Sequence, residues 1–351
     1  MSDYLETIRN KYDIKDYKES RVTIPDLPRE GIVLIVGTSG SGKSTILRSL
    51  GEIKQPYIDD EAYVISNFSS AERGEELLLS CGLRTIPAWF RPPVTLSNGE
   101  RHRFEMAMCL DQGINTIDEF TSVVDRDTAK SLAYSVRKYY DRQADNKPLY
   151  IASCHRDIAE WLDPDYVYDT DICVLENRRS LHRLGGRPPI TLTIQSASNT
   201  YWRHFGKYHY LDTALSKSAH CYVGFIDQKP VVFGAVLHST SGTLRSYWRG
   251  HRTVVLPEFQ GLGIGSAFSD AVAEIYHSRG LLYYSKTAHP AFGGHRNNSP
   301  LWQATSTNGK SRATSYLNED GTKRLMPGHG SATVERDAAR VCYSHKYIGR
   351  G

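Results

Sequence analysis

The sequence of 351 residues has no apolar run of the roughly 18–20 residues that a membrane-spanning helix needs. Its first residues, Met1 to Glu6, are not a basic stretch followed by an apolar one, so we expect no signal peptide. The six cysteines lack CxxC spacing, which disfavours zinc ligation and disulfides. Internal repeats and low-complexity tracts are also missing. These absences predict a cytoplasmic protein with reduced thiols and no membrane partner.

The net charge of +4 conceals an asymmetry between the two halves of the chain. From Arg187 onward, 19 Lys and Arg stand against 9 Asp and Glu, a balance of +10 that leaves −6 for the first 186 residues. The second half also holds 10 of the 13 histidines. A basic domain favours a polyanionic partner, because neutralising phosphates releases counterions. Ordinary surface charge is the alternative interpretation.

Paired glycines and paired prolines, Gly185-Gly186 and Pro188-Pro189, mark the expected domain boundary. We therefore predict a first domain over 1–183, a linker over 184–189, and a second domain over 190–351 that includes a C-terminal extension.

The two halves differ in the order of their expected elements. In the first half, apolar strands alternate with helices, which predicts an α/β domain with a parallel sheet; the strands are expected at 31–36, 114–117 and 149–152, and the helices at 44–50, 100–110 and 128–142. The second half begins with antiparallel strands and continues into a β-α-β unit, which predicts an α+β domain; strands are expected at 190–196, 221–226, 231–237, 253–256 and 281–286, and helices at 200–210 and 266–278.

A glycine-rich segment follows the first expected strand directly and opens a helix. It fits the P-loop pattern GxxxxGK[ST] in full, as Gly37-Thr38-Ser39-Gly40-Ser41-Gly42-Lys43-Ser44-Thr45. Glycines let backbone N–H groups surround phosphates, and a helix N-terminus favours anions. Lys43 is expected at the β- and γ-phosphates and Ser44 at Mg²⁺. The segment therefore predicts binding of ATP and Mg²⁺.

Four further elements follow in order, and with them the first half resembles the cassettes of ABC-type ATPases. They are a signature-like loop with Ser97 and Gly99 (Leu96–Glu100), a Walker B-like strand ending in Asp118 and Glu119, a D-loop-like Ser122–Asp125, and His155 after a strand. The resemblance implies that Asp118 holds Mg²⁺ through water, Glu119 polarises the attacking water and His155 contacts the γ-phosphate. It also implies a homodimer in which Ser97 and Gly99 of one subunit cover the ATP of the other.

The first half also departs from transporter cassettes. Only 54 positions separate Lys43 from Ser97, Asn98 and Glu100 replace the usual Gly and Gln, and no convincing Q-loop glutamine is found. A shortened helical subdomain without a membrane span disfavours transport and favours ABC ATPases that rearrange nucleic acids or enzymes.

A second glycine-rich turn follows the strand expected at 253–256. Its residues Gln260, Gly261, Gly263 and Gly265 resemble motif A of the GNAT acyltransferases, and the order of the strands from Ile190 to Lys286 matches the same plan. The resemblance implies that backbone N–H groups at the start of the next helix bind the pyrophosphate of acetyl-CoA or another acyl-CoA. A tight turn without a ligand is the alternative.

The catalytic groups of the second domain are less defined. Tyr284, or its neighbour Tyr283, lies where the general acid of GNAT enzymes is found. His289 lies in a polar segment where substrate is expected, and it is either catalytic or a structural residue before Pro290. The aromatic residues between Trp202 and Tyr210 form part of the core, line an acceptor pocket or stack on a base.

Short segments of the second half also resemble the phage Mom group, whose members have a GNAT-like fold and modify adenine in DNA. These segments are His209–Leu211, Val255–Gly261, His289-Pro290 and Tyr343–Gly349. An ABC ATPase joined to a predicted acetyltransferase also resembles a small microbial and viral family.

Three functions follow from these patterns. The first is an ATP-dependent acyltransferase-type enzyme that modifies a nucleic-acid base, with DNA favoured over RNA. The second is an N-acetyltransferase acting on a small amine or a protein lysine and regulated by the ATPase domain. The third is an ATP-switched binding module without transferase chemistry.

Overall fold

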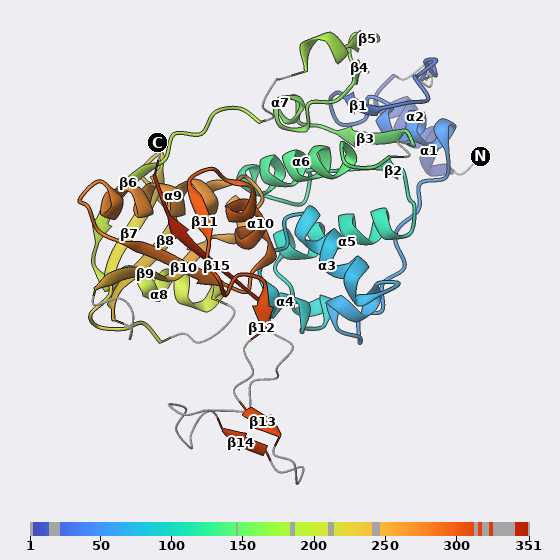
Figure 1. The fold of residues 1–351 in the computed structure, drawn as a ribbon. Coiled ribbons are helices and arrows are strands. Elements are labelled where there is room, and N and C mark those ends of the chain that lie inside the picture. Colours follow the sequence, from blue (N-terminus) through green and yellow to red (C-terminus); the bar gives the residue numbers. More distant parts are fainter. Residues whose placement is uncertain are drawn as a thin grey trace.

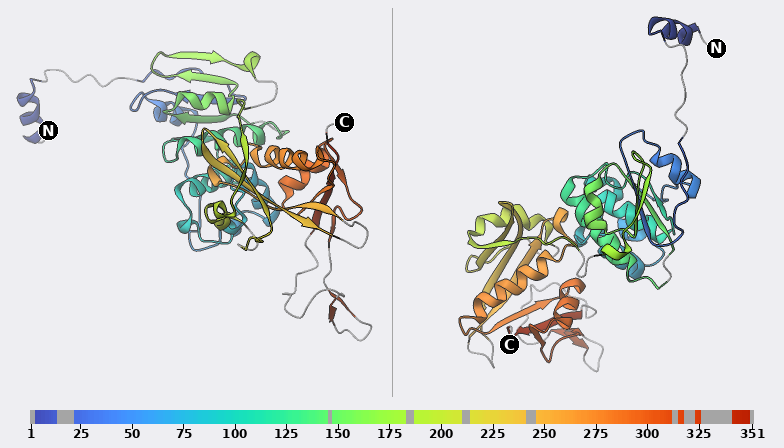
Figure 2. Two further views of the ribbon diagram at one scale, coloured as in Figure 1. Left: turned by 90° about the vertical axis from the view of Figure 1, so that its left-hand side faces the viewer. Right: turned by 90° about the horizontal axis from the view of Figure 1, so that it is seen from above.

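The computed structural model describes residues 3–13, 22–144, 147–182, 187–209, 214–240, 246–311, 315–317, 323–325 and 341–349. Buried apolar side chains gather into clusters on both sides of a parallel sheet in the first half and into another cluster in the second half. Figures 1 and 2 show two bodies that meet along one side. Within the described residues, no helix is long and apolar enough to cross a membrane.

The first domain is built on a sheet whose strands are β1 (Ile32–Val36), β2 (Thr116–Ile117), β3 (Leu149–Ser153), β4 (Tyr166–Asp169) and β5 (Val174–Asn177). The order is β2-β3-β1-β4-β5, with β5 antiparallel to β4 and the other neighbours parallel. All five residues of β1 are buried, as expected for a central parallel strand covered on both faces.

Helices cover this sheet and extend from it. They are α1 (Asp3–Lys11), α2 (Lys43–Leu50), α3 (Ala71–Ser80), α4 (Ile86–Trp89), α5 (Asn98–Asp111), α6 (Arg126–Tyr140) and α7 (Ala159–Leu162), with short 3-10 turns η1 (Val64–Asn67), η2 (Pro93–Thr95), η3 (Arg156–Ile158) and η4 (Arg179–Leu181).

The second domain is a mixed sheet in the order β11-β15-β10-β9-β8-β7-β6, with the short strand β12 paired to β15. Its strands are β6 (Thr193–Ala197), β7 (His220–Ile226), β8 (Lys229–Ser239), β9 (Tyr247–Val255), β10 (Tyr283–Thr287), β11 (Trp302–Ala304), β12 (Lys310–Ser311) and β15 (Val341–Tyr347). Strands β13 (Ser315–Leu317) and β14 (Lys323–Leu325) pair apart from it (Figure 1). The helical elements are η5 (Asn199–Tyr201), α8 (Trp202–Phe205), η6 (Gly206–Tyr208), η7 (Pro257–Phe259), α9 (Ile264–His277) and α10 (Pro290–Asn298).

Strands β9 and β10 separate along their length. They pair in parallel only at Trp248 with Tyr283 and at Arg249 with Tyr284. Beyond these pairs β9 stays with β8, whereas β10 stays with β15. The carboxyl-terminal parts of β9 and β10, the arms of the two strands, therefore leave a gap in the sheet beside the start of α9.

Helix α6 joins the two domains (Figure 1). Its Asp127 pairs with Lys229 of β8 at 2.8 Å, and its Tyr134 packs against the second core. A Cβ at Gly261 would lie 2.4 Å from the Ser135 hydroxyl oxygen, so the glycine turn sits directly against this helix. The side-chain oxygen of Gln260 accepts the Arg84 backbone N–H at 3.1 Å.

The α/β and α+β architectures predicted for the two halves are confirmed, including the antiparallel start and the parallel β9-α9-β10 unit. Several expected elements differ in extent from the observed ones; the strand expected at 253–256, for example, runs from Tyr247 to Val255 as β9. The helix expected over 200–210 is divided into η5, α8 and η6, with Gly206 packed against the Trp202 ring where a helix interior would favour another residue. The strand expected over 114–117 begins only at Thr116, because the Ile114 N–H is bound to the Cys109 carbonyl at the end of α5.

The expected linker lies only partly within the described residues, since 183–186 fall outside them. The domain boundaries therefore stay a prediction.

Phe268 of α9 fills the space above two glycines of the second sheet. A Cβ at Gly234 would lie 2.4 Å from its ring and one at Gly224 would lie 3.2 Å from it. We expect Phe268→Ala to lower the free energy of unfolding by about 3–5 kcal/mol, because the surrounding backbone cannot close the void. Urea unfolding of the full chain measures this loss. Phe90→Ala, at a ring that is 62% exposed, is the control, and equal losses would contradict the packing described.

Candidate functional sites

The P-loop lies between β1 and α2 in a conformation that depends on glycine. Gly40 and Gly42 have φ values of 78° and 95°, and Gly42 is the residue that caps the amino terminus of α2. Of the other predicted nucleotide contacts, Ser39 and Thr45 are exposed and Ser44 is half-buried. The segment thus places backbone N–H groups and a helix N-terminus at one accessible surface.

The loop is held from both ends. The Lys43 ammonium donates to the carbonyls of Gly37 and Thr38 at 2.9 and 2.7 Å. The Thr38 N–H donates to the Asp171 carboxylate at 3.0 Å, and that carboxylate is bound in turn by Arg156 at 2.6 Å. These contacts keep the Lys43 ammonium against the loop that would surround a phosphate.

The residues expected to act on the γ-phosphate follow β2 and β3. Because β2, β3 and β1 are parallel neighbours, Asp118, His155 and Gly37 lie at the same edge of the sheet. Glu119 is exposed, with φ at 52°. The chain therefore brings the predicted ATP-site residues of one subunit to one surface.

The groups expected to hold Mg²⁺ fit that ion chemically. The Ser44 hydroxyl and the Asp118 carboxylate are oxygen donors, which Mg²⁺ prefers, and it usually keeps several waters besides. In the described part of the chain, no group of three or more His, Cys, Asp or Glu side chains forms a denser metal site. When bound with ATP, Mg²⁺ would neutralise charge on the phosphates.

His155 is hydrogen-bonded and lies near a positive charge. Its Nδ1 is 2.8 Å from the Thr121 hydroxyl, which also bonds Ser153 at 2.7 Å. Burial and the nearby Arg126 guanidinium lower the pKa of His155, against an opposing contribution from Asp157. The imidazole is therefore positioned as a hydrogen-bonding group.

The signature-like loop forms a helix cap. Ser97 caps α5, and the Glu100 carboxylate accepts the Ser97 backbone N–H at 3.0 Å while the Ser97 hydroxyl accepts the Glu100 N–H at 3.4 Å. Glu100 thus fills the place of the usual glutamine with a structural role. Ser97 is exposed, and Gly99 faces Thr128 at the start of α6.

A second candidate site is a cavity of about 1100 Å³ between the two domains. It is lined by the separated arms of β9 and β10, the start of α9, α10, and first-domain residues of 79–86 and α6. Three of the predicted acyl-CoA residues contribute to it differently. Gly263, with φ at 79°, caps α9, and a Cβ there would meet no atom within 4 Å. Gly261 packs on Ser135, and a Cβ at Gly265 would lie 3.0 Å from both Phe292 and Val255.

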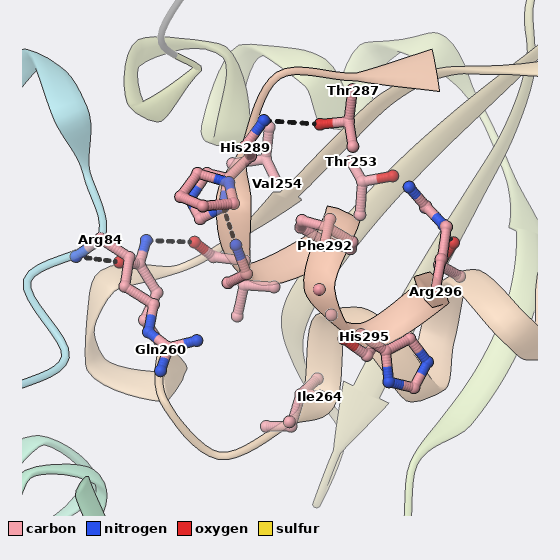
Figure 3. Close-up of a pocket in the computed structure, with 18 of the residues that line it drawn as sticks. Arg84, Thr253, Val254, Gln260, Ile264, Thr287, His289, Phe292, His295 and Arg296 are labelled. Carbon is pink, nitrogen blue, oxygen red and sulfur yellow. Dashed lines mark hydrogen bonds between the residues drawn. The ribbon is translucent and has the colours of Figure 1, made fainter. Parts of the chain in front are cut away.

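Gln260 lines the same cavity, but its side chain is engaged within the protein. Besides accepting from Arg84, it donates to the Val255 carbonyl at 2.9 Å (Figure 3) and to the Thr85 hydroxyl at 3.2 Å. It therefore fixes the glycine turn to β9 and to the first domain.

His289 also lines the cavity and links it to the first domain (Figure 3). Its Nδ1 accepts the Ala291 N–H at 3.3 Å at the start of α10, and the ring hydrogen-bonds the Arg84 backbone. Burial and the Arg84 charge lower the pKa of His289 to about 4. These contacts give it a positioning role in this structure, and its catalytic role stays a prediction.

The two tyrosines of β10 face opposite sides of the sheet. Tyr283 lines the cavity, and burial raises the pKa of its phenol, which keeps the proton on the oxygen. Tyr284 is not among the lining residues, and its ring packs against Tyr247 with centroids 5.3 Å apart. The cavity therefore brings together the glycine turn, His289 and Tyr283.

Helix α10 supplies a buried arginine that the sequence did not single out. Arg296 is 4% exposed, donates to the Ser269 hydroxyl at 2.9 Å, and lies over the rings of Phe292 and Trp302. Its Nε and Nη1 have no hydrogen-bond partner within the described residues. Burial lowers the pKa of Arg296 to about 10.

The aromatic segment 202–209 divides between core and cavity. Trp202 is buried against Phe233, whereas Tyr208 and His209 line the cavity. The core interpretation therefore holds for Trp202, whereas an acceptor pocket or base stacking stays a prediction for Tyr208 and His209.

No protein-family model and no curated protein matches the chain. Among solved structures, the ribosomal-protein-S18-alanine N-acetyltransferase from Escherichia coli is 14% identical over 46% of this chain and 96% of its own, with a TM-score of 0.31. A GNAT-family acetyltransferase from Streptococcus pneumoniae is 11% identical over 46% and 100%, with a TM-score of 0.30. A bacterial ABC transporter cassette, described as dimeric, is 18% identical over 44% and 88%, with a TM-score of 0.33. At these scores the likenesses carry no conclusion about activity.

We expect Arg126→Gln to raise the pKa of His155. The substitution removes a neighbouring positive charge and frees the Asp157 carboxylate, which Arg126 now binds, to stabilise the imidazolium. A titration of the His155 ring resonances by NMR, assigned with His155→Gln, measures the change. An unchanged or lower pKa would contradict the described electrostatics.

Proposed function

We propose that the chain is an ATP-binding and ATP-hydrolysing ABC-type ATPase joined to an acyltransferase-type enzyme that modifies a nucleic-acid base, with DNA favoured over RNA. One observation carries the transferase half. The amino terminus of α9, capped by Gly263, opens on the cavity between the separated arms of β9 and β10.

The ATPase half is supported by the P-loop and by the common edge of β1, β2 and β3. There Lys43 and Ser44 would meet the phosphates and Mg²⁺, with Asp118 beside them. Glu119 would orient the attacking water and His155 would donate to the γ-phosphate. The exposed Ser97 at the start of α5 supports a homodimer in which this residue and Gly99 reach the ATP of the partner subunit.

The donor would be acetyl-CoA or another acyl-CoA. Free backbone N–H groups of the first turn of α9 suit a pyrophosphate, and the open space at Gly263 admits it without a clash. The cavity volume of about 1100 Å³ accommodates a ligand of this size.

In the transfer, the acceptor nitrogen would attack the thioester carbonyl carbon. A carbon–nitrogen bond forms as the carbon–sulfur bond breaks, and the proton lost by nitrogen balances the thiol that leaves as coenzyme A. Tyr283 is the phenol of β10 that lines the cavity and could return this proton to sulfur. The catalytic roles of Tyr284 and His289 stay predictions.

The nucleic-acid acceptor is supported by the excess of basic residues from Arg187 onward, 19 against 9 acidic ones. Tyr208 and His209 add rings at the cavity that can stack on a base.

The test is mass spectrometry of nucleosides from DNA and RNA of cells that express the chain. We expect a new nucleoside mass that disappears with Lys43→Ala and with Gly263→Trp. Gly280→Trp is the matched control, because Gly280 also has a left-handed φ, 72°, and open space at its Cβ but does not line the cavity. Unmodified nucleosides together with acyl-CoA turnover on small amines or protein lysines would reject the nucleic-acid assignment.

A further inference from the structure

We propose that the ATPase domain supplies part of the donor site: Arg84, Lys138 and Arg142 bind the phosphates of a coenzyme A-type donor whose pyrophosphate lies at the start of α9. This inference rests on the proposed function and adds to it a phosphate subsite on the other domain.

The three cations come together from two elements of the first domain. Arg84 follows α3, Lys138 lies in the last turn of α6, and Arg142 lies just beyond that helix. All three line the cavity on which Gly263 opens. Figure 3 shows Arg84 and Gln260 on one side of this cavity and Arg296 on the other.

The charge of the cavity wall is strongly one-sided. Seven Lys or Arg side chains line it against a single carboxylate, Asp270. That carboxylate already accepts from His295 at 2.8 Å and from the Trp302 indole at 2.7 Å. The wall therefore suits a ligand with several negative charges.

The three cations of the first domain face one another instead of acidic residues. Arg137, their neighbour on α6, pairs with Asp141 at 2.7 Å and with Asp165 at 2.9 Å. Within the described residues, no ion pair of this kind joins Arg84, Lys138 or Arg142 to an acidic side chain. Burial together with the charges of Arg142 and Arg84 lowers the pKa of Lys138, and burial with Arg142 lowers that of Arg84 to about 10. An anion placed among them would remove this repulsion.

Hydrogen bonds of Gln260 fix the position of Arg84 relative to the glycine turn. Gln260 binds the Arg84 backbone N–H at 3.1 Å and also the Val255 carbonyl of β9 at 2.9 Å. One ligand can therefore contact both the start of α9 and the cations of the first domain. A coenzyme A-type molecule fits this arrangement, because it carries a pyrophosphate and a separate ribose phosphate on one compact frame.

A cavity of about 1100 Å³ between two domains favours such a compact polyphosphate over the extended backbone of a nucleic acid. Arg296 strengthens the same assignment. It is almost fully buried at the cavity wall, and its Nε and Nη1 nitrogens have no hydrogen-bond partner among the described residues. A buried guanidinium of this kind is costly unless a ligand group accepts from it.

The test measures binding to the full chain by isothermal titration calorimetry at low salt. The probes are coenzyme A, 3′-dephospho-coenzyme A, 4′-phosphopantetheine and pantetheine, which lose phosphates stepwise. We expect Lys138→Met and Arg142→Met each to weaken coenzyme A about tenfold, as for the loss of one charge-assisted contact, and to leave pantetheine unchanged. Lys130→Met is the matched control on the same helix, since Lys130 lies over the Trp161 ring and does not line the cavity.

Each other outcome overturns the inference in a distinguishable way. Coenzyme A binding that Gly263→Trp abolishes but Lys138→Met and Arg142→Met leave intact would retain the proposed donor and reject the subsite. Undetectable binding of coenzyme A by the unaltered chain would reject both. If Lys138→Met weakened the binding of an oligonucleotide and not that of coenzyme A, the three cations would be assigned to nucleic-acid binding. Equal ATP affinity and thermal midpoints of all variants verify that each one folds.

Discussion

Helix α6 packs both against the rest of its own domain and against the second domain, and the arrangement of the two sites depends on this packing. At its start, Asp125 caps the helix through the N–H groups of Asp127 and Thr128, beside the predicted ATP site. Further along, Ser131 accepts from the buried Arg103 of α5 at 2.7 Å. Near its end, Ser135 lies against Gly261, so the glycine turn of the second domain can approach only because that residue has no side chain. One helix thus links the predicted ATP site to the glycine turn that is proposed to bind a pyrophosphate.

This arrangement gives the domain interface a chemical role. The polar groups of Gln260 and His289 form hydrogen bonds with residues 84 and 85 and with neighbouring backbone. These bonds join the cavity wall of the second domain to the first domain. Movement of α6 relative to the sheet would therefore change the cavity wall, since the helix that begins at the Asp125 cap also carries Lys138. In the proposed function, the ATPase and the transferase share this helix, which would give them a direct physical route for coupling.

The sequence was sufficient where a site is built from neighbouring residues. The P-loop and the turn at 260–265 are contiguous, so their glycines and the helices after them were predictable from local pattern alone. Ser97 and Glu100 are equally close in the chain, but they were assigned only to a signature-like loop, and their capping box was not predicted. By contrast, Arg84 and Gln260 are 176 positions apart, and no local signal joins them.

The position of β15 was also beyond prediction, because it enters the sheet between β10 and β11 although β11 ends at Ala304 and β15 begins only at Val341. Arg296 belongs to a short helix rich in glycine and asparagine, which local propensity disfavours and packing on α9 stabilises. At 199–208 the sequence predicted too much regular structure. The aromatic spacing suggested one helix, whereas the segment is divided into η5, α8 and η6.

A crystal structure of the full chain grown with coenzyme A tests most directly whether the cavity between the domains is the donor site. The pyrophosphate should lie at the first turn of α9 beside Gly263, with Lys138 or Arg142 of the first domain within hydrogen-bond distance of a phosphate. Coenzyme A bound outside this cavity, or bound there with the first domain withdrawn from it, would contradict the shared site.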